Sequence, residues 1–207
     1  MTCRRAWAEI DLAAIRENAR LARGRGGRPI MAVVKADAYG HGAGPVARAL
    51  DGGVEFFGVA GLEEGIALRE AGALSPVFLL GAALPGEREE IVRRGFAVAL
   101  STLAEARRFN AVAAALGVRH PVHLSADTGM GRMGFPERTF RENVLDVAAL
   151  PHLRVDGVCS HLPSADEDFE YTEMQLARFA RLVESLTRRP RYAHICNSSQ
   201  STARLRD

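Results

Sequence analysis

The sequence is short of three features that would place it in a specialised class of protein. It has three cysteines, Cys3, Cys159 and Cys196, an odd number without paired spacing, so neither a disulfide framework nor a zinc site is expected. No apolar run approaches the roughly 18 residues of a membrane span. Residues 1–7 contain two arginines but lack the apolar core of a secretory signal. A reducing cytoplasm is therefore the expected location.

The chain also has little net charge, +2 from 27 basic and 25 acidic residues. This balance provides no excess of positive charge for nucleic acid or an anionic membrane, so neither is expected as a partner. Hydrophobic residues make up 47% of the chain and charged residues 25%, which excludes a disordered or fibrous protein. At about 150 residues per domain, 207 residues correspond to one domain or one and a half.

Lysine is nearly absent. Lys35 is the only lysine among the 27 basic residues, and all the others are arginines. Arginine stays protonated in proteins, whereas lysine can lose its proton and attack a carbonyl group. Either this lysine survives by chance or it marks a position where an amine nucleophile is needed, and composition does not decide between the two.

Short apolar runs alternate with segments of helical periodicity along the whole chain. The runs predict buried strands at 30–34, 56–60, 77–80, 96–100, 122–124, 155–159 and 192–196. The periodic segments predict helices at 12–24, 62–69, 102–116, 140–150 and 171–186. This alternation indicates an α/β fold whose parallel sheet is buried on both faces. An open doubly wound sheet and a (β/α)8 barrel both fit, although a barrel typically needs about 250 residues.

Polar side chains follow four of the predicted strands, at the point where each strand ends. They are Lys35, Arg132, His161, Asn197 and Ser198. Because the carboxyl ends of parallel strands open on one crevice, we expect these side chains to converge there. Each one alone has a structural explanation, as a turn, a helix cap or a core histidine. Their common position at one end of the sheet favours a functional site.

The chemistry of a desolvated lysine indicates the class of reaction. An apolar setting disfavours the ammonium, and the free amine can then form a Schiff base with a carbonyl, including the aldehyde of pyridoxal phosphate. That cofactor also needs phosphate donors, for which Ser198 and nearby backbone amides are suitable. His161 could face its ring, and Arg132 could lie near its phenolic oxygen. A sugar-phosphate aldolase would also use a barrel lysine, and this pattern does not separate the two.

Five segments resemble the bacterial alanine racemases and occur in the expected order. They are 7–12, 32–42, 127–135, 159–167 and 194–198. The segment at 32–42, AVVKADAYGHG, resembles the pyridoxal-phosphate attachment motif of that family. The resemblance extends over nearly the whole chain. It implies a (β/α)8 TIM-type barrel, incomplete here with about seven strands, followed by a mostly β C-terminal domain.

The resemblance also implies a role for each site residue. Lys35 would form the aldimine with pyridoxal phosphate and act as one of two proton-transfer bases. Arg132 would bind the phenolic oxygen of the cofactor and orient the substrate carboxylate. The remaining cofactor-binding residues would be Tyr39 and Ser198 at the phosphate, His161 against the pyridine ring, and Asn197 beside Ser198. The second base would be a tyrosine from the C-terminal domain of a partner subunit.

The implied activity is interconversion of L-alanine and D-alanine by a cytoplasmic head-to-tail homodimer, which supplies D-alanine for peptidoglycan. Three alternatives remain: a racemase for serine or for several amino acids, a non-catalytic pyridoxal-phosphate-binding protein, and a decarboxylase of the same fold. No metal site is expected, because His120 and His123, three residues apart on an extended segment, point to opposite faces. The segment at 39–44 lacks the spacing of a nucleotide-binding loop.

Two departures from the family pattern affect these expectations. Ser125 stands where the family often has a carbamylated lysine that supports the arginine, so either another anion supports Arg132 or it is held more loosely. Residues 12–207 would form the barrel without its last strand, and residues 1–11 would supply a strand to the C-terminal domain. We expect this chain by itself to be inactive or nearly so, because one of the two bases and part of the cofactor site would be absent.

Overall fold

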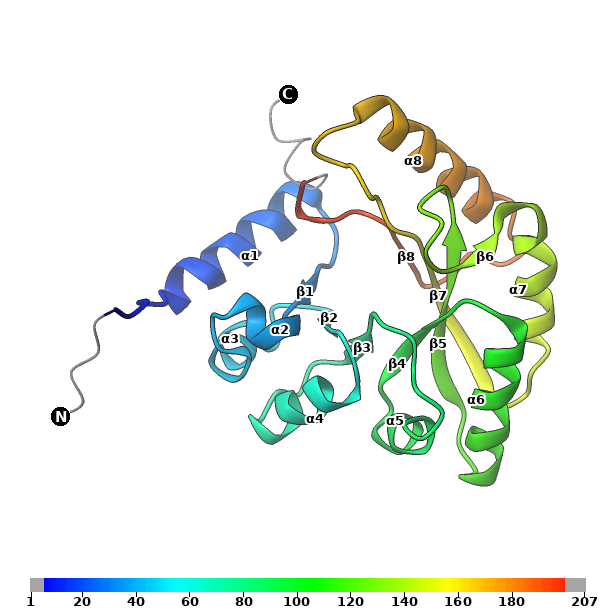
Figure 1. Ribbon diagram of the computed structural model, residues 1–207, viewed down its shortest axis with the longest axis horizontal. Helices are drawn as coiled ribbons and strands as arrows, with labels where there is room; N and C mark the ends of the chain where they lie inside the picture. The colour runs from blue at the N-terminus through cyan, green and yellow to red at the C-terminus, as the bar shows by residue number, and fades with distance from the viewer. Residues whose placement is uncertain (1–5, 200–207) are drawn as a thin grey trace.

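The computed structural model describes residues 6–199, which form a single curled sheet with helices on its outer side (Figure 1). The strands are β1 (Met31–Val33), β2 (Phe56–Val59), β3 (Val77–Leu79), β4 (Ala97–Leu100), β5 (His120–Asp127), β7 (Leu153–Cys159) and β8 (Tyr192–His194). They pair in parallel in the order β1-β2-β3-β4-β5-β7-β8, and the short β6 (Phe135–Pro136) pairs with β5. A doubly wound sheet would reverse its strand order in the middle, whereas this order never reverses. The fold is therefore an incomplete (β/α)8 barrel, as predicted.

Helices follow most of the strands. They are α1 (Leu12–Gly26), α2 (Lys35–Tyr39), α3 (Ala43–Leu50), α4 (Leu62–Glu70), α5 (Arg88–Arg94), α6 (Leu103–Ala115), α7 (Phe140–Ala148) and α8 (Phe169–Glu184), with a 3-10 turn at Glu137–Thr139. The five predicted helices are all present. The sequence did not predict α2, α3 and α5, each of which is at most eight residues long. Over eight residues or fewer, a helical period repeats at most about twice, which is too little to separate a helix from a loop.

Side-chain caps explain where the longer helices begin. Asp168 accepts a hydrogen bond from the Tyr171 backbone at 2.9 Å, so α8 begins two residues before its predicted start. Thr102 caps α6 in the same way, through the Glu105 amide at 3.1 Å. At the other end of a helix, Gly27 with φ 58° closes α1, three residues beyond the predicted end at Gly24. Local polar chemistry thus sets boundaries that apolar periodicity leaves uncertain.

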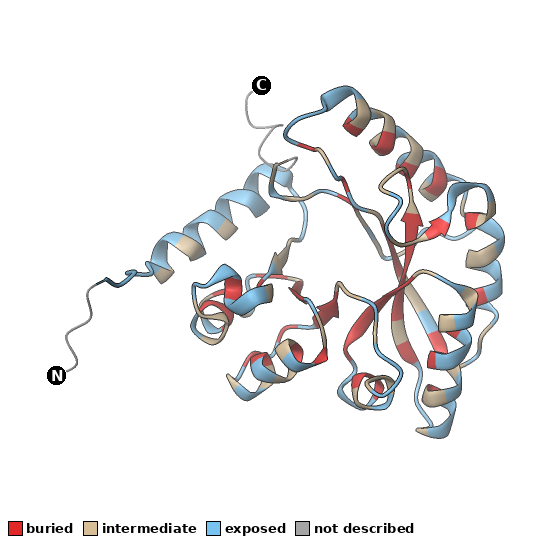
Figure 2. Cartoon of the chain, in the orientation of Figure 1, coloured by how far each residue is buried: buried red, intermediate tan, exposed pale blue. Residues whose placement is uncertain are grey.

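The sheet separates two layers of apolar side chains. Figure 2 shows that the central strands are largely buried. The larger layer lies between the strands and the helices and includes the fully buried Phe57, Phe96 and Phe109. The smaller layer fills the inside of the curved sheet and consists of Phe56, Phe78, Ala97, Ala99 and Cys159, with Met31, Leu80 and Tyr192 against them. Successive residues of a strand point to opposite faces, so β2, β3 and β4 each contribute to both layers.

The two histidines of β5 lie in different layers, which confirms the expectation that they point to opposite faces. His120 stacks on Phe109 of α6, with ring centroids 5.5 Å apart and an interplanar angle of 3°. His123 lies inside the barrel, and its Nδ1 is 2.9 Å from Nε2 of His194. Burial lowers the pKa of His123 to about 3, and that of His194 to about 4. Both interior histidines are therefore uncharged at neutral pH.

His120 is expected to cost stability, and its replacement by leucine should recover it. Neither ring nitrogen of His120 has a hydrogen-bond partner within the part of the chain that the structure describes. Leucine is similar in volume and has no polar atoms, so His120→Leu should raise the free energy of unfolding at pH 7 by about 1 kcal/mol. Urea denaturation of both proteins measures the difference.

The same variant should weaken the dependence of stability on pH. Burial, with a smaller contribution from the Arg154 charge, lowers the pKa of His120 to about 4, against about 6.5 in an unfolded chain. Between these values the unfolded state binds the extra proton, so stability is lost as the pH falls from 6.5 towards 4, by up to about 1.4 kcal/mol per pH unit. Parallel stability curves for the wild type and His120→Leu over this range would contradict the assignment.

The N-terminal region is the least packed part of the described chain. Residues 6–11 have no strand partner within residues 6–199, and Trp7 is 72% exposed. Their assignment to a strand of a second domain therefore stays a prediction. Helix α1 has no buried residue, and Figure 2 shows it in the colours of exposed and intermediate residues. Over the residues that the structure describes, no helix is both long enough and apolar enough to cross a bilayer.

Candidate active site

The structure places the predicted site residues after the carboxyl ends of four strands. Lys35 follows β1, Arg132 lies in the loop after β5, His161 follows β7, and Asn197 and Ser198 follow β8. Burial lowers the pKa of His161, and the positive charges of Arg132 and then Lys35 lower it further. These two cations act on His161 across the space between them, so the three side chains share one electrostatic environment. All three residues follow the carboxyl ends of strands, as expected, and the convergence of their side chains on one site stays a prediction.

The segment after β8 is tied to the segment after β7. The Asn197 side-chain amide donates to the backbone carbonyl of Leu162 at 3.3 Å. Leu162 follows His161 directly, so this bond brings the Asn197–Ser198 segment next to the histidine. Tyr39, four residues after the lysine, has a side chain that is 60% exposed at the same end of the barrel. All six predicted residues thus belong to one end of the sheet.

The backbone directly after Lys35 is a turn of left-handed helix. Ala36, Asp37, Ala38 and Tyr39 have φ values of 51°, 54°, 54° and 56°. Residues other than glycine avoid this region, at a cost of roughly 1–2 kcal/mol each. Such a conformation persists only where the surrounding structure fixes it. The sequence gives no sign of it, because alanine, aspartate and tyrosine are ordinary residues of right-handed helices and loops.

Hydrogen bonds within and around this turn hold its shape. The Ala38 amide donates to the Val34 carbonyl at 2.9 Å, and the Gly42 amide to the Asp37 carbonyl at 2.9 Å. The Asp37 carboxylate accepts from the Ala43 amide at 2.6 Å, at the start of α3. The lysine therefore extends from a closely constrained backbone.

Glycines and one aspartate shape the loop that carries Arg132. Asp127 accepts hydrogen bonds through Oδ1 from the amides of Gly129 and Gly131, both at 3.0 Å. Gly134 has a φ of 118°, and a Cβ there would lie 2.7 Å from the Asp127 nitrogen. The loop thus returns against its own first residues, and only glycine fits at that point.

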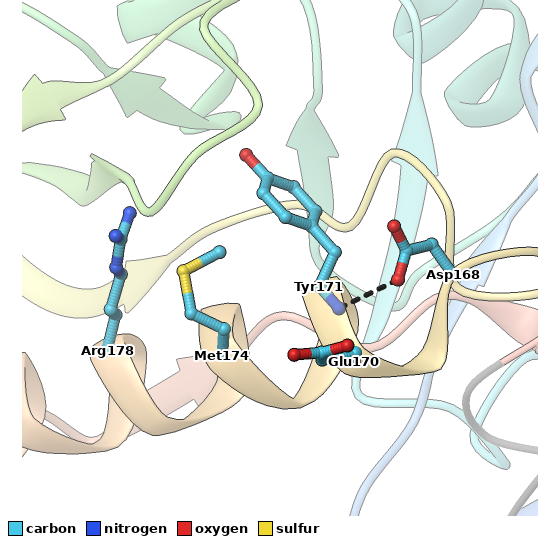
Figure 3. Close-up of a pocket in the computed structure, with 5 residues that line it drawn as sticks. All are labelled: Asp168, Glu170, Tyr171, Met174 and Arg178. Carbon is cyan, nitrogen blue, oxygen red and sulfur yellow. Dashed lines mark hydrogen bonds between the residues drawn. The ribbon is translucent and has the colours of Figure 1, made fainter.

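Three polar residues on one face of α8 anchor the same loop. Tyr171 donates to the Gly129 carbonyl at 2.6 Å, and Arg178 to the Thr128 carbonyl at 3.3 Å. Gln175, which is fully buried, donates to both the Thr128 hydroxyl and the His161 carbonyl at 3.3 Å. Figure 3 shows Tyr171 and Arg178 projecting to the same side of the helix. Their i, i+4, i+7 spacing is the signal that could have identified them. The prediction of a helix at 171–186 used only its apolar period.

The open depression drawn in Figure 3 is distinct from the predicted site. Its lining residues are Asp168, Glu170, Tyr171, Met174 and Arg178. None of the six predicted site residues lines it. Its importance lies in Tyr171 and Arg178, which support the loop of Arg132 from the outside.

The structure shows the surroundings of Ser125 and of Arg132, the arginine that the family's carbamylated lysine would support. Ser125 is buried and pairs with Cys159 in the β5–β7 register. Burial raises the pKa of the Cys159 thiol to about 12, and a hydrogen bond with Ser125 opposes that shift. Arg132 is exposed and makes no hydrogen bond or ion pair within residues 6–199. Arg132 therefore has no supporting anion among residues 6–199, and the choice between another anion and a looser arginine stays a prediction.

Comparisons with known proteins give consistent matches. The family described as "Alanine racemase, N-terminal domain" matches residues 10–206. An alanine racemase from Geobacter sulfurreducens is 43% identical over 205 residues, which cover 93% of this chain and 53% of the relative. An alanine racemase of Clostridium difficile 630 superimposes with a TM-score of 0.90 at 30% identity and covers 95% of this chain and 54% of its own.

A second similar structure is that of a racemase for a different amino acid. It is a histidine racemase from Leuconostoc mesenteroides, with a TM-score of 0.83 at 27% identity, covering 92% of this chain and 52% of its own. The chain spans about half the length of each of these three relatives.

Proposed function

The chain belongs to the family of alanine racemase N-terminal domains, and from this premise we propose that it forms the pyridoxal-phosphate-binding part of an enzyme that interconverts L-alanine and D-alanine. The observation that supports the proposal best is the position of Lys35 at the carboxyl end of β1, in one electrostatic environment with Arg132 and His161. A lysine in such a position is the residue that pyridoxal phosphate requires for covalent attachment.

The donor set fits that cofactor. Two cationic side chains, Lys35 and Arg132, act on a histidine whose pKa is lowered by burial and by their charges. This excess of positive charge suits a phosphorylated cofactor and a substrate carboxylate. In the proposal Lys35 holds the cofactor covalently, Tyr39 and Ser198 bind its phosphate, and His161 packs on its ring. Asn197, bonded to the Leu162 carbonyl, keeps the Ser198 segment beside His161.

Each residue has a defined task in the proposed reaction. The bound cofactor would withdraw electrons from the amino acid and so acidify its Cα–H bond. Nζ of Lys35 removes or returns that proton on one face of the substrate. Arg132 binds the substrate carboxylate and so fixes which bond of Cα lies within reach of Nζ. Inversion needs a second base on the opposite face, and we assign it to a tyrosine of a partner subunit in a homodimer.

One other function has a specific observation in its favour. The structural similarity to a histidine racemase makes racemisation of a different amino acid a second candidate. In either case we propose a cytoplasmic enzyme, because three cysteines without paired spacing are typical of a protein from a reducing compartment. For the alanine enzyme the product D-alanine would serve peptidoglycan synthesis. Racemisation assays with alanine, serine and histidine, made on this chain joined to a C-terminal domain of the family, separate the candidates.

The proposal is tested by trapping the cofactor. The 207-residue chain is incubated with pyridoxal phosphate, reduced with borohydride, digested and mapped. We expect a phosphopyridoxyl group on the peptide that contains Lys35, at about one group per chain. A chain that remains unlabelled at this lysine would contradict the proposed function.

A further inference from the structure

One carboxylate reaches the strained turn that follows Lys35. We propose that Glu64 of α4 is a positioning residue for Lys35, because it fixes the backbone from which the lysine side chain extends. The inference rests on the proposed function for the role of Lys35. Its structural part, the hold of Glu64 on the turn, is independent of any cofactor.

The two oxygens of Glu64 bind two separate segments of backbone. Oε1 accepts a hydrogen bond from the Ala36 amide at 2.8 Å, and Oε2 accepts one from the Ala60 amide at 2.7 Å. Ala36 directly follows Lys35 at the end of β1, and Ala60 directly follows β2. The carboxylate therefore joins the carboxyl ends of two neighbouring strands at the predicted site.

The hydrogen bond between the Ala36 amide and Glu64 stabilises the beginning of the turn, where the helix itself provides no partner. An amide in the first turn of a helix has no carbonyl partner within that helix. Glu64 provides the acceptor for this amide, through a charged group whose hydrogen bonds are stronger than neutral ones. Ala36 is also the first of the four residues with positive φ, so its orientation determines the path of the turn.

An ordinary capping role accounts for only one of the two bonds. Glu64 is the third residue of α4, and a glutamate at this position commonly bonds an amide just before its own helix, as it does here with Ala60. The Ala36 amide is 28 residues away in sequence and gains nothing for α4. A cap alone would alter the stability of α4 and leave the turn after Lys35 unchanged.

The decisive comparison is Glu64→Gln against Glu63→Gln. Glutamine at 64 keeps nearly the same shape but has only one acceptor oxygen. We expect that oxygen to stay on the Ala60 amide, the bond that caps α4, so that the Ala36 amide loses its partner. Glu63 precedes it in the same first turn of α4 and is exposed, so its replacement removes the same charge from the same helix end. Differences between the two variants therefore report the two backbone bonds rather than net charge.

Two measurements are made on the 207-residue chain. Amide hydrogen exchange, resolved by residue with NMR, is expected to be about tenfold faster at Ala36 in Glu64→Gln and unchanged there in Glu63→Gln. The rate of borohydride-trapped labelling of Lys35 with pyridoxal phosphate is expected to fall about tenfold in Glu64→Gln alone. Exchange in β4 and β5 shows that each variant is folded.

The outcomes separate this inference from the proposed function. A wild-type chain that is never labelled at Lys35 contradicts the function, while exchange at Ala36 still tests the hold of Glu64. Wild-type exchange at Ala36 in Glu64→Gln, or labelling at the wild-type rate, overturns the inference. If Glu64→Gln loses protection in β4 and β5, Glu64→Asp replaces it, because it keeps the charge but is one methylene shorter. The same selective change at Ala36 is then expected.

Discussion

Replacement of Lys35 by arginine is expected to reduce covalent labelling by pyridoxal phosphate at least about 100-fold, because a guanidinium stays protonated and has no free amine to attack the aldehyde. The charge at the site is kept, so the variant tests nucleophilicity and not electrostatic attraction. Lys35 is the only lysine of the chain, and the variant leaves no lysine at all. The measurement is the phosphopyridoxyl content after borohydride reduction.

A matched control moves the lysine instead of deleting it. Arg28 is exposed at the surface, between α1 and β1. The double variant Lys35→Arg, Arg28→Lys keeps one lysine per chain but places it away from Arg132 and His161. It should label far more slowly than the wild type, at the rate of an ordinary surface amine. Labelling as fast as in the wild type would show that any exposed amine suffices, and the assignment of Lys35 would fail.

Gly134→Ala is expected to lower the free energy of unfolding by about 3 kcal/mol. The φ of 118° excludes most side chains, and the new Cβ would lie 2.7 Å from the Asp127 nitrogen and 2.9 Å from the Ala126 carbonyl carbon. Both contacts are with backbone atoms, which cannot move aside without shifting β5. Because Arg132 lies in this loop, we also expect slower labelling of Lys35. Urea denaturation measures the stability change.

Gly131→Ala is the control in the same loop. Gly131 has a φ of 68°, but no atom lies within 4 Å of a Cβ placed there. Only backbone strain remains, so a loss of about 1 kcal/mol is expected. Equal losses in the two variants would show that the close return of the loop onto Asp127 is not what requires glycine at 134.

The sequence predicted the sheet well because its strands are short apolar runs with helices between them. All seven predicted strands are present, and each is found within a few residues of its predicted position. The helices α3 and α5 were missed because a helix of about two turns repeats its apolar face at most once, as α3 does with Val46 and Leu50. Polar residues at strand ends identified the rim of the barrel, and Lys35, Arg132 and His161 do share one environment there.

Contacts between distant segments were beyond the reach of sequence patterns. Gln175 bonds Thr128 and His161 from a helix face that sequence analysis described only by its apolar residues. The interior pair of His123 and His194 depends on the strand order, which places β5 and β8 on either side of β7. Neither contact leaves a periodic signal, because the partners are far apart in the chain.

The sequence by itself determined the alternation of strands and helices, the single amine available for a carbonyl, and the order of the segments shared with a family of racemases. These are properties of composition and local spacing. Only the tertiary structure decided that the lysine stands before a left-handed turn, that Glu64 binds this turn from a neighbouring helix, and that Arg132 is unpaired among the described residues. The physical reason is that backbone strain and pairing depend on which distant segments the curled sheet brings within hydrogen-bond distance.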